Sequence, residues 1–189
     1  MVGATQLALP GRLHSADYAS EAELLAACRR RELGAFEQLY RDHGVRLKSI
    51  ACHIAGNRQD AEDAVQETFL KVYRGIDGFH EQSGIGTWLC RICINACYDL
   101  VRKRRLEAER AEAPEPRPPQ QNQLTLRVEL DDALRRIHPR HRMVFLLFAV
   151  EGMRHAEIGA ILEIPEGTSK AWLFEAKREL QRLLTEAKG

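Results

Sequence analysis

The sequence predicts an all-α fold made of two small helical domains joined by a flexible, proline-rich linker. Apolar residues recur at steps of three and four along most of the chain, and no segment alternates as a strand would. Four of the seven prolines fall within residues 114–119, in a stretch with almost no apolar residue larger than alanine. We therefore expect a flexible tail at 1–19, domains at 20–106 and 124–187, and a linker at 107–123.

Four helices are expected in the first domain, over residues 21–30, 35–55, 60–74 and 86–105. Ser20 is suited to cap the first of them, because its hydroxyl can accept a hydrogen bond from an early helical amide. Gly56 is suited to end the second, since glycine readily adopts the left-handed conformation that stops a helix. A glycine-containing loop over 75–84 separates the last two helices.

Four more helices are expected in the second domain, over residues 125–137, 140–151, 155–162 and 165–186. The last two have the pattern of a helix-turn-helix, with Gly159 allowing a second helix to cross closely and Pro165 at the first position of that helix. The early amides near Glu166, Gly167 and Thr168 are then free to meet a phosphate, and the helix can enter a major groove. A helical hairpin packed in a bundle gives the same pattern.

The overall charge indicates no partner, because 28 Lys and Arg residues oppose 27 Asp and Glu residues for a formal net charge of +1. No apolar run is long enough to span a bilayer, and the start of the chain lacks the features of a signal peptide. We expect a cytoplasmic protein without membrane insertion. Local charge is more informative: five arginines between residues 135 and 155 face a single acidic residue, Glu151. Such a segment can contact phosphate or form an ordinary solvated helix face.

The third helix begins with an acidic surface. Asp60, Asp63 and Glu67 share one side of the helix at three- and four-residue spacing, which can dock a basic protein surface. Acids near the amino end of a helix also stabilise its dipole, and that alternative stays open.

The fourth helix combines basic and aromatic side chains. Its outer side repeats Arg91, Asn95 and Arg102, and Trp88 and Phe79 lie nearby. A basic track beside aromatic rings suits single-stranded DNA, whose bases stack on such rings. The alternative is that both aromatic residues belong to the core.

The five cysteines argue against a disulfide framework, because their number is odd and no secretion signal is visible. Cys90, Cys93 and Cys97 have a spacing that can hold a metal, with His53 as a fourth ligand. The same steps of three and four place the thiols on the apolar side of a helix, where cysteine acts as a small hydrophobe. We expect no metal, no cofactor, no small-molecule substrate and no enzymatic activity, since no catalytic grouping is recognisable.

Three segments in order resemble the extracytoplasmic-function (ECF) sigma factors of bacterial RNA polymerase, within the sigma-70 family: DAEDAVQETFLKVYRGIDGF (60–79), TWLCRICINACYDLVRKRR (87–105) and EGMRHAEIGAILEIPEGTSKAWLFEAKREL (151–180). The resemblance implies a region 2-like domain that grips the clamp helices of the polymerase's largest subunit and recognises and melts the minus-ten element. It implies a region 4-like helix-turn-helix domain that reads the minus-thirty-five element on the polymerase flap. The linker would follow the RNA exit path.

The same resemblance implies an alternative sigma factor that directs promoter-specific initiation in a stress or envelope response, held by an anti-sigma factor and nucleoid-associated when active. Residues implied in core polymerase binding are Asp60, Asp63, Gln66 and Glu67. Residues implied at minus-ten DNA are Phe79, Ser83, Ile85, Trp88, Arg91, Asn95, Arg102, Lys103 and Arg104. Residues implied at minus-thirty-five DNA are Arg154, Glu166, Gly167, Thr168, Lys170, Ala171, Trp172, Phe174, Glu175 and Lys177.

The chain departs from the family pattern in its recognition helix, where Trp172 and Glu175 replace two arginines and Ser169 replaces a hydrophobic residue. A carboxylate can accept a hydrogen bond from the amino group of cytosine, so we expect an altered upstream preference. Three alternatives stay open: a stand-alone helix-turn-helix regulator, a cysteine-ligated metal or redox sensor, and a decoy that binds only proteins.

Overall fold

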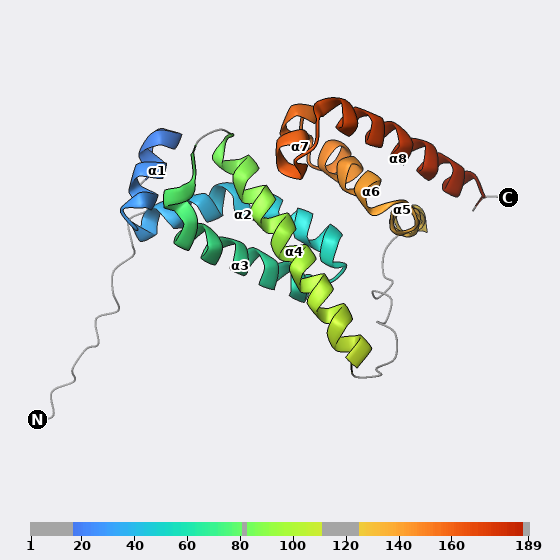
Figure 1. Ribbon diagram of the computed structural model, residues 1–189, viewed down its shortest axis with the longest axis horizontal. Helices are drawn as coiled ribbons and strands as arrows, with labels where there is room; N and C mark the ends of the chain where they lie inside the picture. The colour runs from blue at the N-terminus through green and yellow to red at the C-terminus, as the bar shows by residue number, and fades with distance from the viewer. Residues whose placement is uncertain (1–16, 81–82, 111–124, 187–189) are drawn as a thin grey trace, which may run out of the picture.

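Figure 1 shows the computed structural model, which describes residues 17–80, 83–110 and 125–186. Every regular element in these ranges is helical, which confirms the predicted fold class. The first group comprises α1 (Glu21–Arg29), α2 (Leu33–Ala55), α3 (Arg58–Gly75), the 3-10 turn η1 (Ile76–Gly78) and α4 (Ile85–Arg110). The second comprises α5 (Thr125–Arg136), α6 (Pro139–Phe145), the π-helical turn η2 (Leu146–Val150), α7 (His155–Leu162) and α8 (Glu166–Glu186).

The ends of the first helices follow from local chemistry. The Ser20 hydroxyl accepts a hydrogen bond from the Glu23 amide at 3.2 Å, as expected for an N-cap. Gly56 ends α2 with φ of 75°, a conformation that costs glycine little because it has no Cβ. Asn57 then caps α3, and its side chain accepts from the Asp60 amide at 2.9 Å. The tight turn between α2 and α3 sets these two helices side by side.

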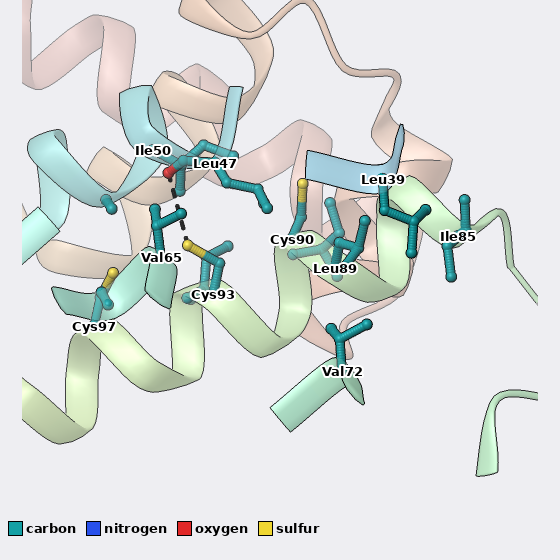
Figure 2. Close-up of a cluster of buried hydrophobic side chains, with 14 of the residues drawn as sticks. Leu39, Leu47, Ile50, Val65, Val72, Ile85, Leu89, Cys90, Cys93 and Cys97 are labelled. Carbon is teal, nitrogen blue, oxygen red and sulfur yellow. Dashed lines mark hydrogen bonds between the residues drawn. The ribbon is translucent and has the colours of Figure 1, made fainter. Parts of the chain in front are cut away.

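Helices α2, α3 and α4 pack on one another around a shared apolar core, which Figure 2 shows in close-up. Leu39, Leu47, Val72 and Leu89 are fully buried there. Each comes from the apolar stripe of its own helix, so the amphipathic pattern alone brings these side chains together. Helix α1 lies across α2 and η1 at one end of this bundle.

The cysteines of α4 belong to this core (Figure 2). Cys90, Cys93 and Cys97 are buried, and the Cys93 thiol donates a weak hydrogen bond to the Leu47 carbonyl at 3.7 Å. Burial raises the pKa of Cys90 to about 12, which disfavours the thiolate that a metal requires. Across the described ranges, no group of three or more His, Cys, Asp or Glu residues is placed to hold a metal ion.

The second group of helices forms a helix-turn-helix supported by α5 and α6. Helix α7 ends at Leu162 with Glu163 as its C-cap, and α8 begins at Glu166. Gly159 lies against the turn that leads into α8, because a Cβ there would be 2.8 Å from the Ile164 carbonyl oxygen and 3.8 Å from Glu166 Cα. Ser169 is fully buried, and its hydroxyl is 3.0 Å from His155 Nδ1. This contact explains how a polar residue occupies a position that faces α7.

Two boundaries differ from the sequence-based prediction. Helix α4 continues to Arg110, so the first four residues assigned to the linker are helical. The helix can continue here because Glu and Ala favour helix and the first proline of the linker is Pro114. Residues 17–19 are also held in place: the Tyr18 hydroxyl donates to Glu32 at 2.7 Å and the Tyr18 amide to Gln38 at 2.9 Å. The rest of the predicted tail and linker lies outside the described residues. No helix in the described part of the chain has the length and apolar character to cross a membrane.

The two groups of helices contact each other. Figure 1 shows α7 beside α4, and η2 also contacts α2. The apolar cluster of the first group continues through this contact into Met143, Leu147, Ile158 and Ile161 of the second. The chain thus has one continuous core across its two predicted domains, in addition to a small separate cluster between α5, α6 and α8.

Candidate nucleic-acid and protein interfaces

The acidic residues at the start of α3 do not form one surface. Asp63 and Gln66 are exposed and Glu67 is partly buried, whereas Asp60 is only 5% exposed. Three of the four residues that the sequence assigned to polymerase binding are therefore accessible on α3. Asp60 faces the neighbouring helix instead.

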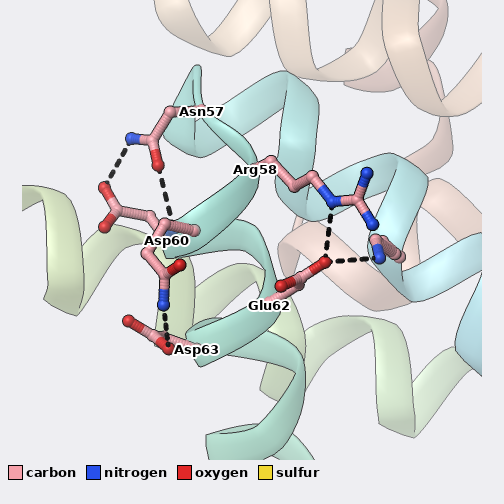
Figure 3. Close-up of polar contacts among 7 residues, drawn as sticks. Asn57, Arg58, Asp60, Glu62 and Asp63 are labelled. Atoms are coloured by element: carbon pink, nitrogen blue, oxygen red, sulfur yellow. Dashed lines mark hydrogen bonds and ion pairs between the residues drawn. The ribbon is translucent and has the colours of Figure 1, made fainter.

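Asp60 is held in a local polar network (Figure 3). Its carboxylate accepts from the Asn57 side-chain amide at 2.8 Å and forms an ion pair with Arg104 of α4. The sequence assigned Asp60 to polymerase and Arg104 to minus-ten DNA, yet the fold brings the two together. Burial is the physical reason, because a buried carboxylate requires nearby donors and a counter-charge. We infer that this pair joins α3 to α4.

A second carboxylate in Figure 3, Glu62, joins α3 to α2. It accepts from Lys48 at 2.8 Å and from Arg58 at 2.9 Å. These two donors lower the pKa of Glu62. The start of α3 is thereby anchored on both sides, which fixes the direction in which Asp63 and Gln66 project.

An exposed apolar stripe continues the accessible side of α3, and the sequence-based assignment missed it. Leu70 and Tyr73 are 49% and 41% exposed, and they follow Asp63 and Gln66 at helical spacing. Tyr40 of α2, which is 57% exposed, packs on Phe69 with ring centroids 5.1 Å apart. Apolar groups beside acids are typical of protein-docking surfaces. The periodic spacing of these α3 residues is the signal that could have found them.

The loop before α4 is built on buried anchors. Phe79 and Ile85 are 4% and 3% exposed, so their side chains belong to the core. The Phe79 ring packs on Trp88 with centroids 5.0 Å apart, and Trp88 is partly buried. Phe79 and Ile85 therefore help to shape the loop, and their contact with minus-ten DNA stays a prediction.

Polar contacts also position this loop. The Ile85 amide at the start of α4 donates to the Glu21 carboxylate of α1 at 3.0 Å. Arg29 of α1 donates to the Phe79 carbonyl at 3.1 Å. Ser83 is partly buried within the loop, and residues 81–82 lie outside the described residues. Helix α1 thus holds both ends of the loop.

The outer side of α4 carries the predicted basic track. Asn95, Arg102 and Lys103 are exposed. Arg91 differs from them, because its guanidinium donates to the Ala160 carbonyl of α7 and lies 3.4 Å from the carboxylate of Glu163, the C-cap of α7. The fold brings most of the predicted minus-ten residues onto one helix, with Arg91 already engaged by the other domain.

The recognition helix α8 presents an exposed face with the predicted composition. Lys170, Ala171, Phe174 and Lys177 are all exposed on it, and Phe174 is 65% exposed. Trp172 lies off this face and is partly buried, with its ring 5.7 Å from the Arg140 guanidinium. The spacing of residues along the sequence could not distinguish Trp172 from its exposed neighbours, because the burial of Trp172 depends on its contact with α6.

The remaining residues predicted at minus-thirty-five DNA surround this face. Arg154, Glu166 and Gly167 are exposed, and Thr168 is partly buried. Glu166 pairs with Lys170 at 2.7 Å, which lowers the pKa of Glu166. Glu175 is paired with Arg178 at 2.5 Å. Because both carboxylates have cations one helical turn away, their charge is partly neutralised.

Comparison with known protein families identifies both halves. Residues 39–107 match the family described as Sigma-70 region 2, and residues 127–180 match Sigma-70, region 4. The first match covers α3 and most of α2 and α4, and so includes the acidic residues of α3 and the basic track of α4. The second covers the helix-turn-helix.

Curated relatives and a solved structure agree with these matches. The chain is 33% identical to the ECF RNA polymerase sigma factor SigE of Mycolicibacterium smegmatis over 159 residues, covering 79% of this chain and 62% of SigE. It is 31% identical to the ECF RNA polymerase sigma factor SigM of Mycobacterium tuberculosis over 166 residues, covering 87% and 85%. The sigma factor RpoE in complex with the anti-sigma factor NepR from Bartonella quintana superposes with a TM-score of 0.65 at 27% identity, over 79% of this chain and 96% of that chain. The chain belongs to the ECF sigma factors of the sigma-70 family.

Proposed function

We propose that this chain is an alternative sigma factor, which binds core RNA polymerase and directs promoter-specific transcription initiation. The observation that carries this proposal is the presence of both sigma-70 regions in one chain, which also aligns with 85% of SigM. It acts by binding and positioning, without catalytic activity of its own. We place it in the cytoplasm, and on the nucleoid when it is bound to polymerase.

Core polymerase would dock on the exposed side of α3. Asp63, Gln66 and Glu67 provide the polar part of this surface, with charge on Asp63 and Glu67, and Leu70 and Tyr73 provide its apolar part. An interface of this kind combines apolar burial with charges that set orientation and association rate. In the sigma family, the clamp helices of the largest polymerase subunit are the partner implied for this surface, and the flap is the partner implied for the second domain.

Promoter DNA would be read at two places. Trp88, Arg91 and Asn95 of α4 would hold the unpaired minus-ten strand, and Arg102 and Lys103 would contact its phosphates. The exposed face of α8 would enter the minus-thirty-five major groove. Polymerase would hold both domains at the promoter spacing, so the second contact becomes intramolecular. A nearly neutral chain can then bind promoter DNA through two modest contacts.

The solved RpoE structure also suggests a regulatory partner. RpoE is bound there by the anti-sigma factor NepR, and the structure of the present chain aligns with 96% of the RpoE chain. We propose that an anti-sigma factor likewise holds this chain inactive. A stress or envelope signal would release it.

In vitro transcription with purified core polymerase and a promoter library tests the proposed function. Adding the chain is expected to start transcripts from a subset of promoters that share minus-ten and minus-thirty-five elements. Core polymerase without the chain provides the baseline. A stand-alone regulator would instead bind palindromic DNA without polymerase. Absence of both association with core polymerase and new transcripts would overturn the proposal.

The two aspartates of α3 provide a matched pair of variants. Asp63→Lys is expected to weaken core polymerase binding about tenfold, because it reverses a charge in the docking surface, with little change in folding stability. Asp60→Ala is expected to lower the free energy of unfolding by about 1 to 3 kcal/mol, since it leaves Asn57 and Arg104 without their acceptor. Binding by fluorescence anisotropy and urea denaturation measure the two effects. Equal loss of stability in both variants would contradict the assignment.

Glu175 is expected to set base preference upstream. Its carboxylate can accept a hydrogen bond from cytosine in the major groove, so Glu175→Arg should change the preferred base at one position of the minus-thirty-five element. Selection from a randomised promoter library with core polymerase measures this shift. Glu186→Arg makes the same charge change at the far end of α8 and serves as the control. If Glu175→Arg instead strengthened promoter binding equally at all upstream sequences, a contact between Glu175 and a base would be contradicted.

A further inference from the structure

An aromatic ring in the second domain connects the recognition helix with the helix before it. Phe148 lies in the π-helical turn η2, and its ring stacks on the His155 imidazole of α7, with centroids 4.8 Å apart and an interplanar angle of 21°. The Lys177 ammonium of α8 lies 5.7 Å from the centroid of the same ring, within the range of a cation–π contact. Phe148 therefore contacts both helices of the helix-turn-helix.

A buried hydrogen bond extends these contacts to a second point on α8. His155 Nδ1 is 3.0 Å from the Ser169 hydroxyl, and Ser169 is fully buried. Ser169 and Lys177 are separated by about 12 Å along the axis of α8, at 1.5 Å per residue. Because the two attachments also lie at different angles around the axis, together they resist both tilting and rotation of α8 against α7. We term these four residues, Phe148, His155, Ser169 and Lys177, the Phe148 brace.

The backbone around Phe148 is unusual. The Glu151 amide donates to the Leu146 carbonyl at 3.1 Å, a hydrogen bond that spans five residues instead of the four of an α-helix. Such π-helical turns are rare, and they occur frequently at functional sites. The wider turn shifts side chains around the helix axis relative to those of α6. It thereby contributes to the direction in which the Phe148 ring meets α7.

The polar part of the brace orients α8 more narrowly than apolar packing would. An apolar residue at position 169 would bury its side chain against α7, but the hydrophobic effect has no preferred direction. A hydrogen bond has a preferred distance and angle. The contact between Ser169 and His155 therefore holds α8 in one orientation, and the stacking of His155 on Phe148 holds the imidazole in place.

We propose that Phe148 is a positioning residue for minus-thirty-five recognition, which holds α8 at the angle where its exposed face meets the bases. The proposal rests on the proposed function and deepens it. Lys170 and Phe174 are exposed on α8, and both lie between Ser169 and Lys177 along the helix. Base readout needs such side chains held to within about 0.5 Å by the residues that support them. Phe148 supplies this support through α8, without touching DNA.

Transcription by holoenzyme that contains the full chain tests the proposal. One template is a promoter selected from a randomised library, and the other is the same promoter with a scrambled minus-thirty-five element. Phe148→Leu keeps an apolar side chain but removes the ring. The ratio between the half-saturating concentrations of the two templates should fall about threefold, because α8 reads bases less selectively when it is held less firmly. The maximal rate at saturating promoter should stay unchanged, since melting is assigned to the first domain.

Three further variants separate positioning from packing. Phe148→Tyr retains the ring and should keep the parent ratio. Phe145→Leu makes the same change at a partly buried residue of α6 outside the brace, so it should keep the ratio even if it lowers stability. Ser169→Ala, a smaller change, should lower the ratio in the same direction as Phe148→Leu. Combining Ser169→Ala with Phe148→Leu should cost less than the two separate losses together, because both residues act through His155.

Two kinds of failure are distinguishable. A parent-like ratio in Phe148→Leu or in Ser169→Ala, or an equal fall in Phe145→Leu, would overturn the positioning role and leave the proposed function intact. Urea denaturation shows that each variant is folded at the assay temperature. Absence of promoter-specific transcripts with the parent chain would reject the proposed function, and the positioning role with it.

Discussion

Leu89→Ala is expected to lower the free energy of unfolding by about 2 to 5 kcal/mol, the range for truncating a buried leucine. Leu89 is fully buried on α4 between α2 and α3, where the apolar core of the first domain is centred. Truncation removes its transfer free energy and leaves a cavity, because the neighbouring helices are fixed by their own contacts. Urea denaturation followed by circular dichroism measures the loss. Transcription should fall with it, since α4 carries the proposed minus-ten site.

Leu33→Ala provides a control of identical chemistry. Leu33 is 62% exposed at the start of α2, and alanine is an equally good helix former. Its free energy of unfolding should stay within about 0.5 kcal/mol of the parent. A comparable loss in both leucine variants would show that Leu89 is not the centre of the core.

Gly159→Ala is the second change with a large expected effect. The added Cβ would lie 2.8 Å from the Ile164 carbonyl oxygen, and the obstacle is backbone that cannot rotate away. We expect α7 and α8 to move apart at a cost of about 1 to 3 kcal/mol, as for other overpacked sites. Thermal unfolding measures the destabilisation. The amount of transcript from a minus-thirty-five-dependent promoter should also fall, because the recognition helix is displaced.

Gly167→Ala makes the same substitution where there is room. No atom lies within 4 Å of a Cβ at Gly167, which occupies the first turn of α8. Alanine favours helix over glycine by about 1 kcal/mol, so this variant should be as stable as the parent or more stable. Opposite signs in the two variants are the expected result. A stabilised Gly159→Ala would contradict the close crossing of the two helices.

The acidic surface shows where sequence reasoning stops. Periodicity correctly placed Asp60 and Asp63 on one helix, and at its amino-terminal end. Periodicity could not reveal that Arg104, which lies 44 positions further along the chain, would form an ion pair with Asp60. Asp60 is buried because α4 crosses α3 at that level, and the crossing depends on the packing of three helices. The same limit applied to Phe79, Ile85 and Trp172, whose burial depends on residues distant in sequence.

The cysteines show the opposite case. Their spacing fitted both a metal site and an apolar stripe, and the helical steps of three and four already favoured the stripe. The fold places Cys90, Cys93 and Cys97 in the core on that stripe. Local periodicity was sufficient here, because the side of an amphipathic helix that faces inward is decided mainly by its own apolar residues.

The amino-acid sequence by itself determined the helical class, most helix boundaries, the caps at Ser20 and Gly56, and the family to which the chain belongs. These properties depend on neighbours within a few residues or on motifs read in order. Only the tertiary structure decided which acids are exposed, which aromatic rings are buried, and how Arg91 joins the two domains. The reason is that burial and charge pairing are set by contacts between helices far apart along the chain, which no local pattern encodes.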